Sequence, residues 1–246
     1  MLDAGDALNG EQGIGLLSKG EVQVKAMNLM GYDAMTLGSG DFAIGWDHLQ
    51  DRMEMAQFPM LSANVVLSDT GELVGQPYII KELTPEHRVA IIGLTDPYAA
   101  DLLRAIRERP VRVLDSGETL RRYVDEVSGQ ADIIVLLSHL GFDRDQKLAQ
   151  QFPEIDVIIG GKSGHLFDPP LRPYPSGPVI AQAASLGRRL GVVRLDFDDQ
   201  GNLIQVDGHA ITLGPDVPDD PKIDELLESY QHLIVPTPPP LLEDGE

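Results

Sequence analysis

The chain has 246 residues, 42% of them hydrophobic, which is enough for one substantial globular domain with a buried core. Its 19 Lys and Arg stand against 39 Asp and Glu, and the formal charge of −20 argues against nucleic acid or an anionic membrane surface as a partner. The absence of cysteine excludes disulfides and thiolate metal sites.

No apolar run approaches the roughly 18–20 residues needed to cross a membrane, so we expect no membrane-spanning segment. Residues 1–6 have neither the basic nor the apolar region of a signal peptide, which makes the cytoplasm the default compartment.

Taken in chain order, residues 1–6 are expected to end a strand and to lead into a loop. The first helix is expected over residues 18–30, with Ser18 as its N-cap and Glu21 as the capping-box partner. Further helices are expected over residues 48–55, 99–107, 120–127, 144–152 and 222–233. Strands are expected over residues 33–37, 58–67, 78–80, 89–94, 133–137, 155–159, 179–183, 190–197 and 203–206.

Two of these strands end in polar turns. Residues 133–137 form a continuous apolar run that leads into Ser138-His139-Leu140-Gly141, and residues 155–159 lead into the Gly-rich turn that contains Lys162 and His165. A run of this kind is typical of a central strand buried on both faces. Ligands of open α/β folds bind at the carboxyl ends of such strands, so the candidate site is placed there.

Strands alternate with helices early in the chain, and hairpins become frequent late in it. This order favours an α/β (α+β) sandwich of mixed sheets. The folded domain is expected to span residues 1–233. Residues 234–246 are rich in proline and end in acidic residues, which favours an extended, solvated tail.

Several of these stretches, in their order along the chain, resemble the metallophosphoesterase (calcineurin-like) domain of the 5′-nucleotidase family. The matching stretches are residues 2–7, 28–38, 61–65, 91–95, 137–141, 155–161 and 182–191. The resemblance implies a four-layer α/β/β/α sandwich of two mixed β-sheets. It also implies that the first strand of the domain lies upstream of Asp6, so that this chain is a truncated member that lacks it.

Members of that family bind two divalent metals, Zn, Mn or Fe, which activate water for attack on a phosphate ester. By resemblance, Asp6 matches the bridging aspartate and His139 matches a histidine ligand. Four other positions have lost the family's ligand or catalytic side chains, and His165 falls one residue out of register with the last of them. The four are Ser39, Gly40, Lys162 and Gly164.

Two ligands are too few for a dinuclear site, since even one catalytic metal usually has three protein ligands. We therefore expect a degenerate, non-catalytic domain that needs no cofactor and acts as a structural or interaction subunit. A protein partner or a second copy is expected to complete its sheet. His139 and Asp6 would then be vestigial metal ligands. Alternatively, His139 is simply a hydrogen-bonded histidine at a strand end, and Asp6 caps the turn that it opens.

Two other functions stay open. The first is an active phosphohydrolase of nucleotides or another phosphate ester, with a residual site that holds two divalent metals. The second is a domain that binds an anion or a nucleotide through Lys162 and Arg188. Members of the family are often exported, so the compartment also stays open.

Overall fold

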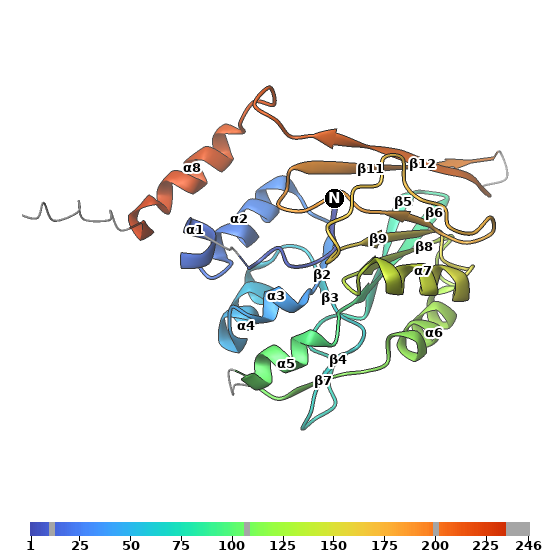
Figure 1. The fold of residues 1–246 in the computed structure, drawn as a ribbon, viewed down its shortest axis with the longest axis horizontal. Coiled ribbons are helices and arrows are strands. Elements are labelled where there is room, and N and C mark those ends of the chain that lie inside the picture. Colours follow the sequence, from blue (N-terminus) through green and yellow to red (C-terminus); the bar gives the residue numbers. More distant parts are fainter. Residues whose placement is uncertain (10–12, 106–108, 199–201, 235–246) are drawn as a thin grey trace, which may run out of the picture.

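A computed structural model describes residues 1–9, 13–105, 109–198 and 202–234, which form a mixed α/β fold as the sequence predicts (Figure 1). The expected tail lies outside the described residues, except for Ile234. The helices have the following bounds: α1 Gly13–Leu17, α2 Glu21–Met30, α3 Ser39–Phe42, α4 Trp46–Met55, α5 Tyr98–Ala105, α6 Ser116–Val127, α7 Phe142–Gln151, α8 Pro221–Ser229 and the 3₁₀ helix η1 Gln231–Leu233.

A five-stranded sheet forms the centre of the molecule. In spatial order its strands are β10 Val179–Ala181, β9 Val157–Gly160, β8 Ile133–Ser138, β6 His87–Leu94 and β5 Tyr78–Thr84. All neighbouring pairs are parallel except β5 and β6, which are antiparallel. The carboxyl ends of β6, β8 and β9 therefore lie at the same edge of the sheet.

The remaining strands form three smaller sheets. The parallel strands β1 Leu2–Asp3, β2 Ala34–Thr36 and β3 Met60–Leu61 make a three-stranded sheet with β1 at one edge. Strands β4 Val65–Leu67 and β7 Val111–Val113 form an antiparallel pair, as do β11 Arg189–Phe197 and β12 Leu203–Thr212. Within the described residues β11 does not pair with β1, so the long hairpin stays a separate sheet.

Both faces of the five-stranded sheet are buried, which explains the uninterrupted apolar run of β8. Ile134 and Leu136 pack with α6 and α7 on one face, in a cluster that includes Leu120 and Leu148. Residues that alternate with them along β8 point to the other face and pack with the three-stranded sheet and the β11–β12 hairpin. A third cluster lies among β2, α2 and α4. The four-layer description stays a prediction.

The N-terminal helix differs from the expectation. Residues 18–30 do not form one helix, because α1 ends at Leu17 and α2 begins at Glu21. Ser18 is not the N-cap. That position belongs to Gly20, whose φ of 80° lies in the left-handed region that glycine adopts without steric cost. The expected strand 58–67 is likewise divided into β3 and β4, and residues 39–42 form the short helix α3, where no helix was predicted.

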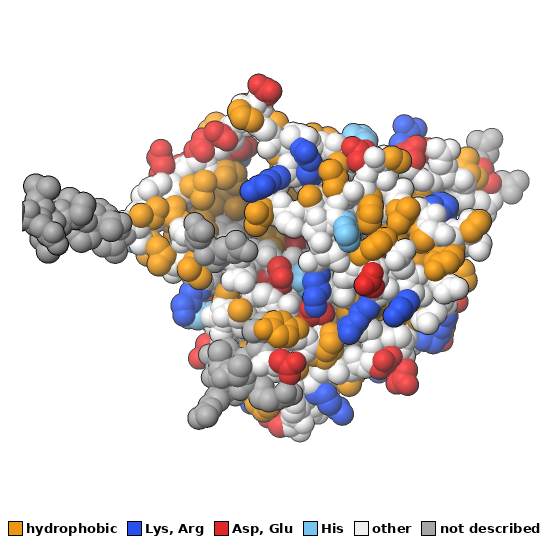
Figure 2. All heavy atoms as spheres, viewed as in Figure 1, with side chains coloured by type: hydrophobic (Ala, Val, Ile, Leu, Met, Phe, Trp, Pro, Cys, Tyr) orange, Lys and Arg blue, Asp and Glu red, His pale blue; other side chains and the backbone are white. Residues whose placement is uncertain are grey.

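Acidic side chains do not gather on one patch of the face shown in Figure 2, where they are interspersed with lysines, arginines and apolar groups. The negative charge of the chain is therefore spread over this face.

Candidate functional site

The ends of five strands bring polar side chains from distant parts of the chain to one place. Asp6 follows β1, Ser39 follows β2, Asp96 follows β6, His139 follows β8 and Lys162 follows β9. Contacts among these side chains connect them in two pairs, Asp6 with His139 and Asp96 with Lys162. The sequence predicts a site at this edge, and the structure places both of its retained polar residues there.

Asp6 and His139 face each other. Oδ2 of Asp6 lies 3.1 Å from Nε2 of His139, although the angle is not that of a well-aligned hydrogen bond. The other imidazole nitrogen, Nδ1, lies 2.6 Å from the carbonyl oxygen of Ala4, so Nδ1 carries the proton that is donated there. The second carboxylate oxygen of Asp6 accepts the backbone N–H of Gly40 at 2.6 Å.

The pair shifts both pKa values. Burial of His139 lowers its pKa, but the adjacent Asp6 carboxylate and the Ala4 carbonyl outweigh burial, and the net shift is upward. Burial raises the pKa of Asp6, but His139, the Gly40 N–H and the charge of Lys162 together bring it below the ordinary value. The charged forms of both groups are therefore favoured together.

Three glycines allow the backbone to approach the imidazole closely. A Cβ atom added at Gly5, Gly38 or Gly161 would lie 2.8 Å from a ring nitrogen of His139, closer than real Cβ atoms pack. Gly5 also has a φ of 94°, which a larger residue adopts only with strain. A side chain at any of these positions would thus collide both with His139 and with atoms of the neighbouring loops.

Asp41 anchors the turn on which Asp6 lies, a role that no local sequence pattern predicts. Its buried carboxylate accepts the backbone N–H groups of Leu8 (2.8 Å), Asp6 (3.0 Å) and Gly38 (2.8 Å). Burial raises the pKa of Asp41 to about 7, against the opposing effect of the Leu8 N–H. These bonds connect the loop after β1 to the loop after β2.

Lys162 forms an ion pair with Asp96. The carboxylate of Asp96 is fully buried, whereas 41% of the Lys162 side chain is exposed. The oxygen that receives the ammonium also accepts the hydroxyl of Ser39 at 3.4 Å, and the other oxygen accepts the backbone N–H of Tyr98 at 3.2 Å. Asp96 was not predicted as a site residue, because nothing near it in the chain marks it as the partner of a charge.

A third buried carboxylate, that of Asp145, lies near His139. Asp145 on α7 accepts the hydroxyl of Ser138 at the end of β8. Burial raises the pKa of Asp145 to about 7, although Ser138 and the charge of His139 act in the opposite direction. This group connects α7 to the strand that carries His139.

His165 does not approach Asp6 or His139. Its ring packs edge-on against Phe142, with centroids 5.1 Å apart, and stacks on Phe167 at 5.6 Å. Gly164 adopts a φ of 64°, and a Cβ there would lie 2.6 Å from the hydroxyl of Ser185. The position one residue before His165 is therefore fitted to glycine in this fold.

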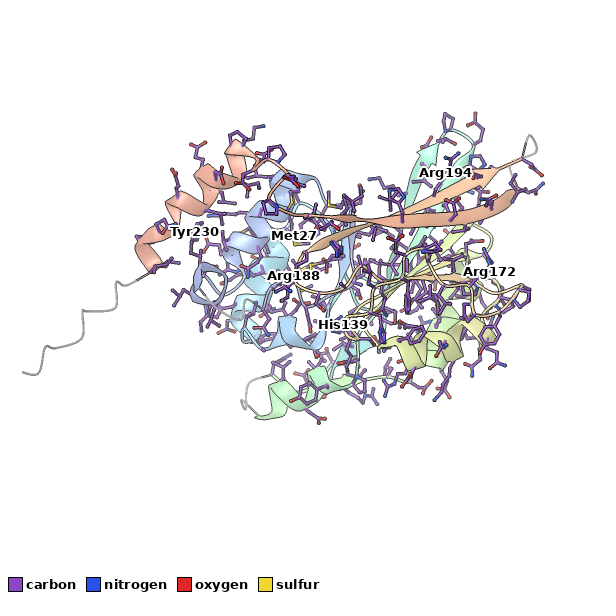
Figure 3. All side chains as sticks on the ribbon, turned by 45° about the horizontal axis from the view of Figure 1, so that its top comes forward. Met27, His139, Arg172, Arg188, Arg194 and Tyr230 are labelled. Carbon is purple, nitrogen blue, oxygen red and sulfur yellow. The ribbon has the colours of Figure 1, made fainter. Side chains whose placement is uncertain are left out.

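Arg188 and Lys162 are not brought together. The ammonium of Lys162 is bound to Asp96, and no contact joins Arg188 to it within the part of the chain that is described. Arg188 lies in the loop just before β11, and Figure 3 labels it together with His139. The proposed anion site thus has no preformed pair of cations here.

The donor set does not fit a dinuclear metal centre. Asp6 and His139 face each other as two ligands of one ion do, and Nε2 of His139 has no well-aligned hydrogen-bond partner. No group of three or more His, Asp or Glu side chains among the described residues is arranged to hold a metal ion. The positions of Ser39, Gly40 and Gly164 supply no carboxylate or imidazole, and Lys162 supplies a positive charge.

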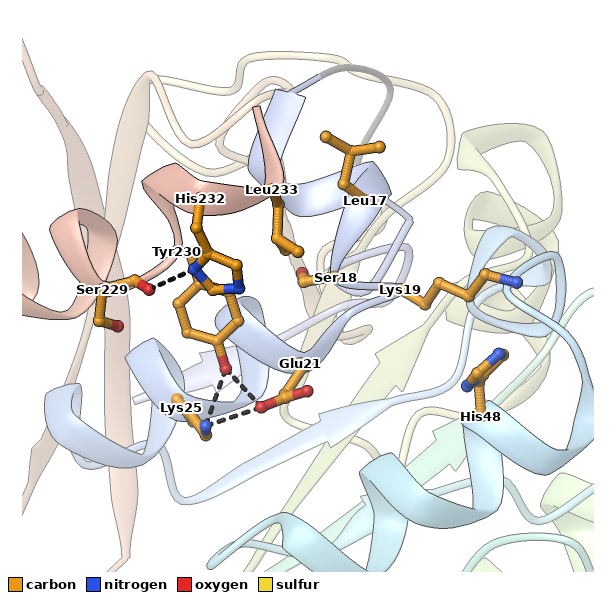
Figure 4. Close-up of a pocket in the computed structure, with 10 residues that line it drawn as sticks. All are labelled: Leu17, Ser18, Lys19, Glu21, Lys25, His48, Ser229, Tyr230, His232 and Leu233. Carbon is orange, nitrogen blue, oxygen red and sulfur yellow. Dashed lines mark hydrogen bonds and ion pairs between the residues drawn. The ribbon is translucent and has the colours of Figure 1, made fainter. Parts of the chain in front are cut away.

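An open pocket of about 550 Å³ lies elsewhere, where α8 and η1 meet α1 and α2 (Figure 4). The phenol of Tyr230 donates to Glu21, and Nζ of Lys25 lies 2.8 Å from the phenol oxygen and 2.7 Å from Glu21. These contacts hold the end of α8 on α2. The residues that line the pocket are Leu17, Ser18, Lys19, Glu21, Lys25, His48, Ser229, Tyr230, His232 and Leu233.

Comparison with known proteins finds homologues among the 5′-nucleotidases. No family model matches the chain. The human 5′-nucleotidase is 31% identical over 248 residues, which cover 91% of this chain and 42% of that protein. The trifunctional nucleotide phosphoesterase protein YfkN of Bacillus subtilis is 30% identical, with 95% of this chain and 18% of that protein covered. The chain thus spans less than half the length of these relatives.

Solved structures agree with these sequence matches. The 5′-nucleotidase precursor of Thermus thermophilus superposes with a TM-score of 0.75 at 32% identity, over 94% of this chain and 48% of the other. The calcineurin-like phosphoesterase YfkN of Bacillus subtilis superposes with a TM-score of 0.78 at 24% identity, over 94% and 82%. The resemblance to this group of phosphoesterases is confirmed. Among the described helices, none has the length and apolar character to cross a membrane.

Proposed function

We propose that this chain, whose homologues are 5′-nucleotidases and calcineurin-like phosphoesterases, is a degenerate and non-catalytic member that acts as a structural or interaction subunit. One observation carries the proposal. Asp6 and His139 face each other across 3.1 Å, while the other positions matched to family ligands supply no further carboxylate or imidazole. Two protein ligands are fewer than a catalytic metal usually has.

The experiment is a metal analysis combined with a turnover assay. Protein purified without chelator is expected to contain no stoichiometric Zn, Mn or Fe, and to leave a generic phosphate ester intact when each metal is added. The B. subtilis relative, prepared in the same way, controls for the assay. Stoichiometric metal together with turnover that His139→Gln abolishes would reject the proposal.

A second candidate function is a metal-dependent phosphohydrolase, and one feature favours it. Nε2 of His139 is buried, lacks a well-aligned partner and faces a carboxylate, which is how two ligands of a single ion are arranged. The same experiment decides between the two functions. If activity is present, its substrate class would be phosphate esters such as nucleotides.

The interaction role follows from two strands with open edges. Within the described residues, β1 pairs only with β2, and β11 pairs only with β12. Leu2 of β1 and Val193 and Leu195 of β11 are only partly buried, although they pack on the same core cluster. Open edges with apolar neighbours favour the addition of a further strand.

We propose that a partner chain or a second copy of this chain supplies that strand. Light scattering coupled to size-exclusion chromatography tests the homo-oligomer: a dimer supports it, and a monodisperse monomer at every concentration argues against it. Val193→Lys on β11 is expected to weaken the dimer, whereas Lys147→Glu on the exposed side of α7 leaves it intact.

A further inference from the structure

Lys162, in the loop after β9, has an unusual backbone conformation. Lys162 adopts a φ of 63°, a left-handed conformation that costs energy for a residue with a side chain. Hydrogen bonds fix the turn around it: the N–H of Gly161 donates to the carbonyl of Ser138 at 2.7 Å, and the N–H of Ser163 donates to the carbonyl of Gly161 at 2.7 Å. The turn thus holds Lys162 in a defined place.

That place is opposite a buried carboxylate. Asp96 is fully buried, and an unpaired charge at such a depth is strongly destabilising. Its other partners are the neutral Ser39 hydroxyl and the Tyr98 N–H. The ammonium of Lys162 is the cation that balances Asp96 among the residues that the structure describes.

The same ammonium acts on Asp6. Its charge is among the causes that lower the pKa of the Asp6 carboxyl, so the two groups lie within electrostatic reach. A single positive charge at the strand ends therefore serves two carboxylates that come from separate loops, one after β1 and one after β6. A metal cation placed among carboxylates has the same electrostatic effect.

We propose that Lys162 is a tethered cation: its ammonium neutralises Asp96, joins the loops after β6 and β9, and keeps a divalent cation out of this end of the sheet. This inference deepens the proposed function and rests on it. A lysine suits the role because its ammonium is a compact point charge on a flexible stem. The Lys162 ammonium would then stabilise the buried Asp96 carboxylate without a metal ion.

A double-mutant cycle tests the direct pairing. The variants are Lys162→Met, Asp96→Asn and the two combined. Lys147→Met is the matched control, since Lys147 is an exposed lysine on α7 that forms no ion pair with the described residues. Lys162→Met is expected to lower Tm by several degrees, because it leaves Asp96 buried without a cation. In the double variant Asp96→Asn is expected to restore most of that loss.

The exclusion of a divalent cation is tested on the same proteins. Excess Mn²⁺ is expected to leave the Tm of the unmodified chain unchanged and to raise that of Lys162→Met, because ligand binding to the folded state stabilises it. The exclusion is overturned if Mn²⁺ moves both melting temperatures equally or moves neither.

The tethered cation as a whole is overturned if Lys162→Met costs no more than Lys147→Met, or if the two changes in the double variant are simply additive. This result is separate from the proposed function. Turnover by the unmodified chain would remove the non-catalytic assignment and leave an observed coupling between residues 162 and 96 in place. Loss of the coupling would leave the turnover assay unaffected.

Discussion

Nε2 of His139 lies 3.1 Å from Oδ2 of Asp6, and the two residues reach this distance from the ends of strands in different sheets. Only 1% of the His139 side chain is exposed. The contact therefore joins the two sheets, and it lies between the two side chains that the family resemblance implies as metal ligands.

This contact predicts a pH-dependent contribution to stability. The folded pKa of His139 is raised, so its contribution is complete below the unfolded value of about 6.5 and is lost as the pH rises through the folded pKa. The pKa of Asp6 is lowered, so its contribution is lost only as the pH falls below about 3.8 toward the folded value. The pair stabilises the fold most between these limits.

His139→Gln is expected to cost about 1–3 kcal/mol at mildly acidic pH and less at alkaline pH. Urea unfolding at both pH values measures the two costs, and His48→Gln controls for the loss of a histidine. An equal cost at both pH values would show that the charge of His139 does not contribute.

Asp145 predicts a second effect of pH on stability, opposite in direction to that of Asp6, because the pKa of Asp145 is raised and that of Asp6 is lowered. Its pKa is raised to about 7, so folding opposes its ionisation, and stability falls as the pH rises from about 4 to about 7. Asp145→Asn can still accept the Ser138 hydroxyl and cannot ionise, and it is expected to remove up to roughly 4 kcal/mol of this loss. Melting temperature against pH measures the effect. Asp143→Asn, an exposed change on the same helix, is the control, and parallel profiles for the two variants would contradict the prediction.

The turn after β9 predicts a steric effect. Gly161→Ala would place a Cβ 2.4 Å from the carbonyl oxygen of Ala4 and 2.8 Å from Nδ1 of His139. It is expected to cost about 1–3 kcal/mol, because a packed core accommodates the added methyl only by shifting. Gly129→Ala, where nothing lies within 4 Å, is expected to stay within about 0.5 kcal/mol of the unmodified chain. Urea midpoints give both values. Equal midpoints for the two variants would mean that the turn moves away from His139 without cost.

Tyr230 predicts the mobility of α8. No residue of this helix is buried, and Tyr230 at its C-terminal end bonds Glu21 and Lys25 of α2. Tyr230→Phe removes the hydroxyl and keeps the ring, so it is expected to cost about 0.5–1.5 kcal/mol locally. Hydrogen exchange measures this: amides of α8 are expected to exchange faster, with the central strands unchanged. Tyr98→Phe, an exposed tyrosine, is the control, and unchanged exchange in α8 would mean that the hydroxyl does not hold the helix.

The local pattern of the sequence was sufficient for the elements that are buried on both faces. The run expected at 133–137 corresponds to β8 Ile133–Ser138, and the run expected at 155–159 overlaps β9 Val157–Gly160. These strands are buried on both faces, so nearly every residue in them is apolar, and a continuous apolar run can be recognised from the sequence alone. The α1–α2 boundary was not predicted, because Gly20 provides a left-handed cap that competes with the Ser18 signal.

The sequence by itself determined the fold and the two side chains, Asp6 and His139, that meet at its strand ends. Only the tertiary structure decided which charges pair with which. The Asp96–Lys162 pair joins residues with no common motif, and Asp41 binds a loop that precedes it in the chain by more than thirty residues. Such pairings depend on which strand ends lie side by side, and the order of strands in a sheet is not written in any local pattern.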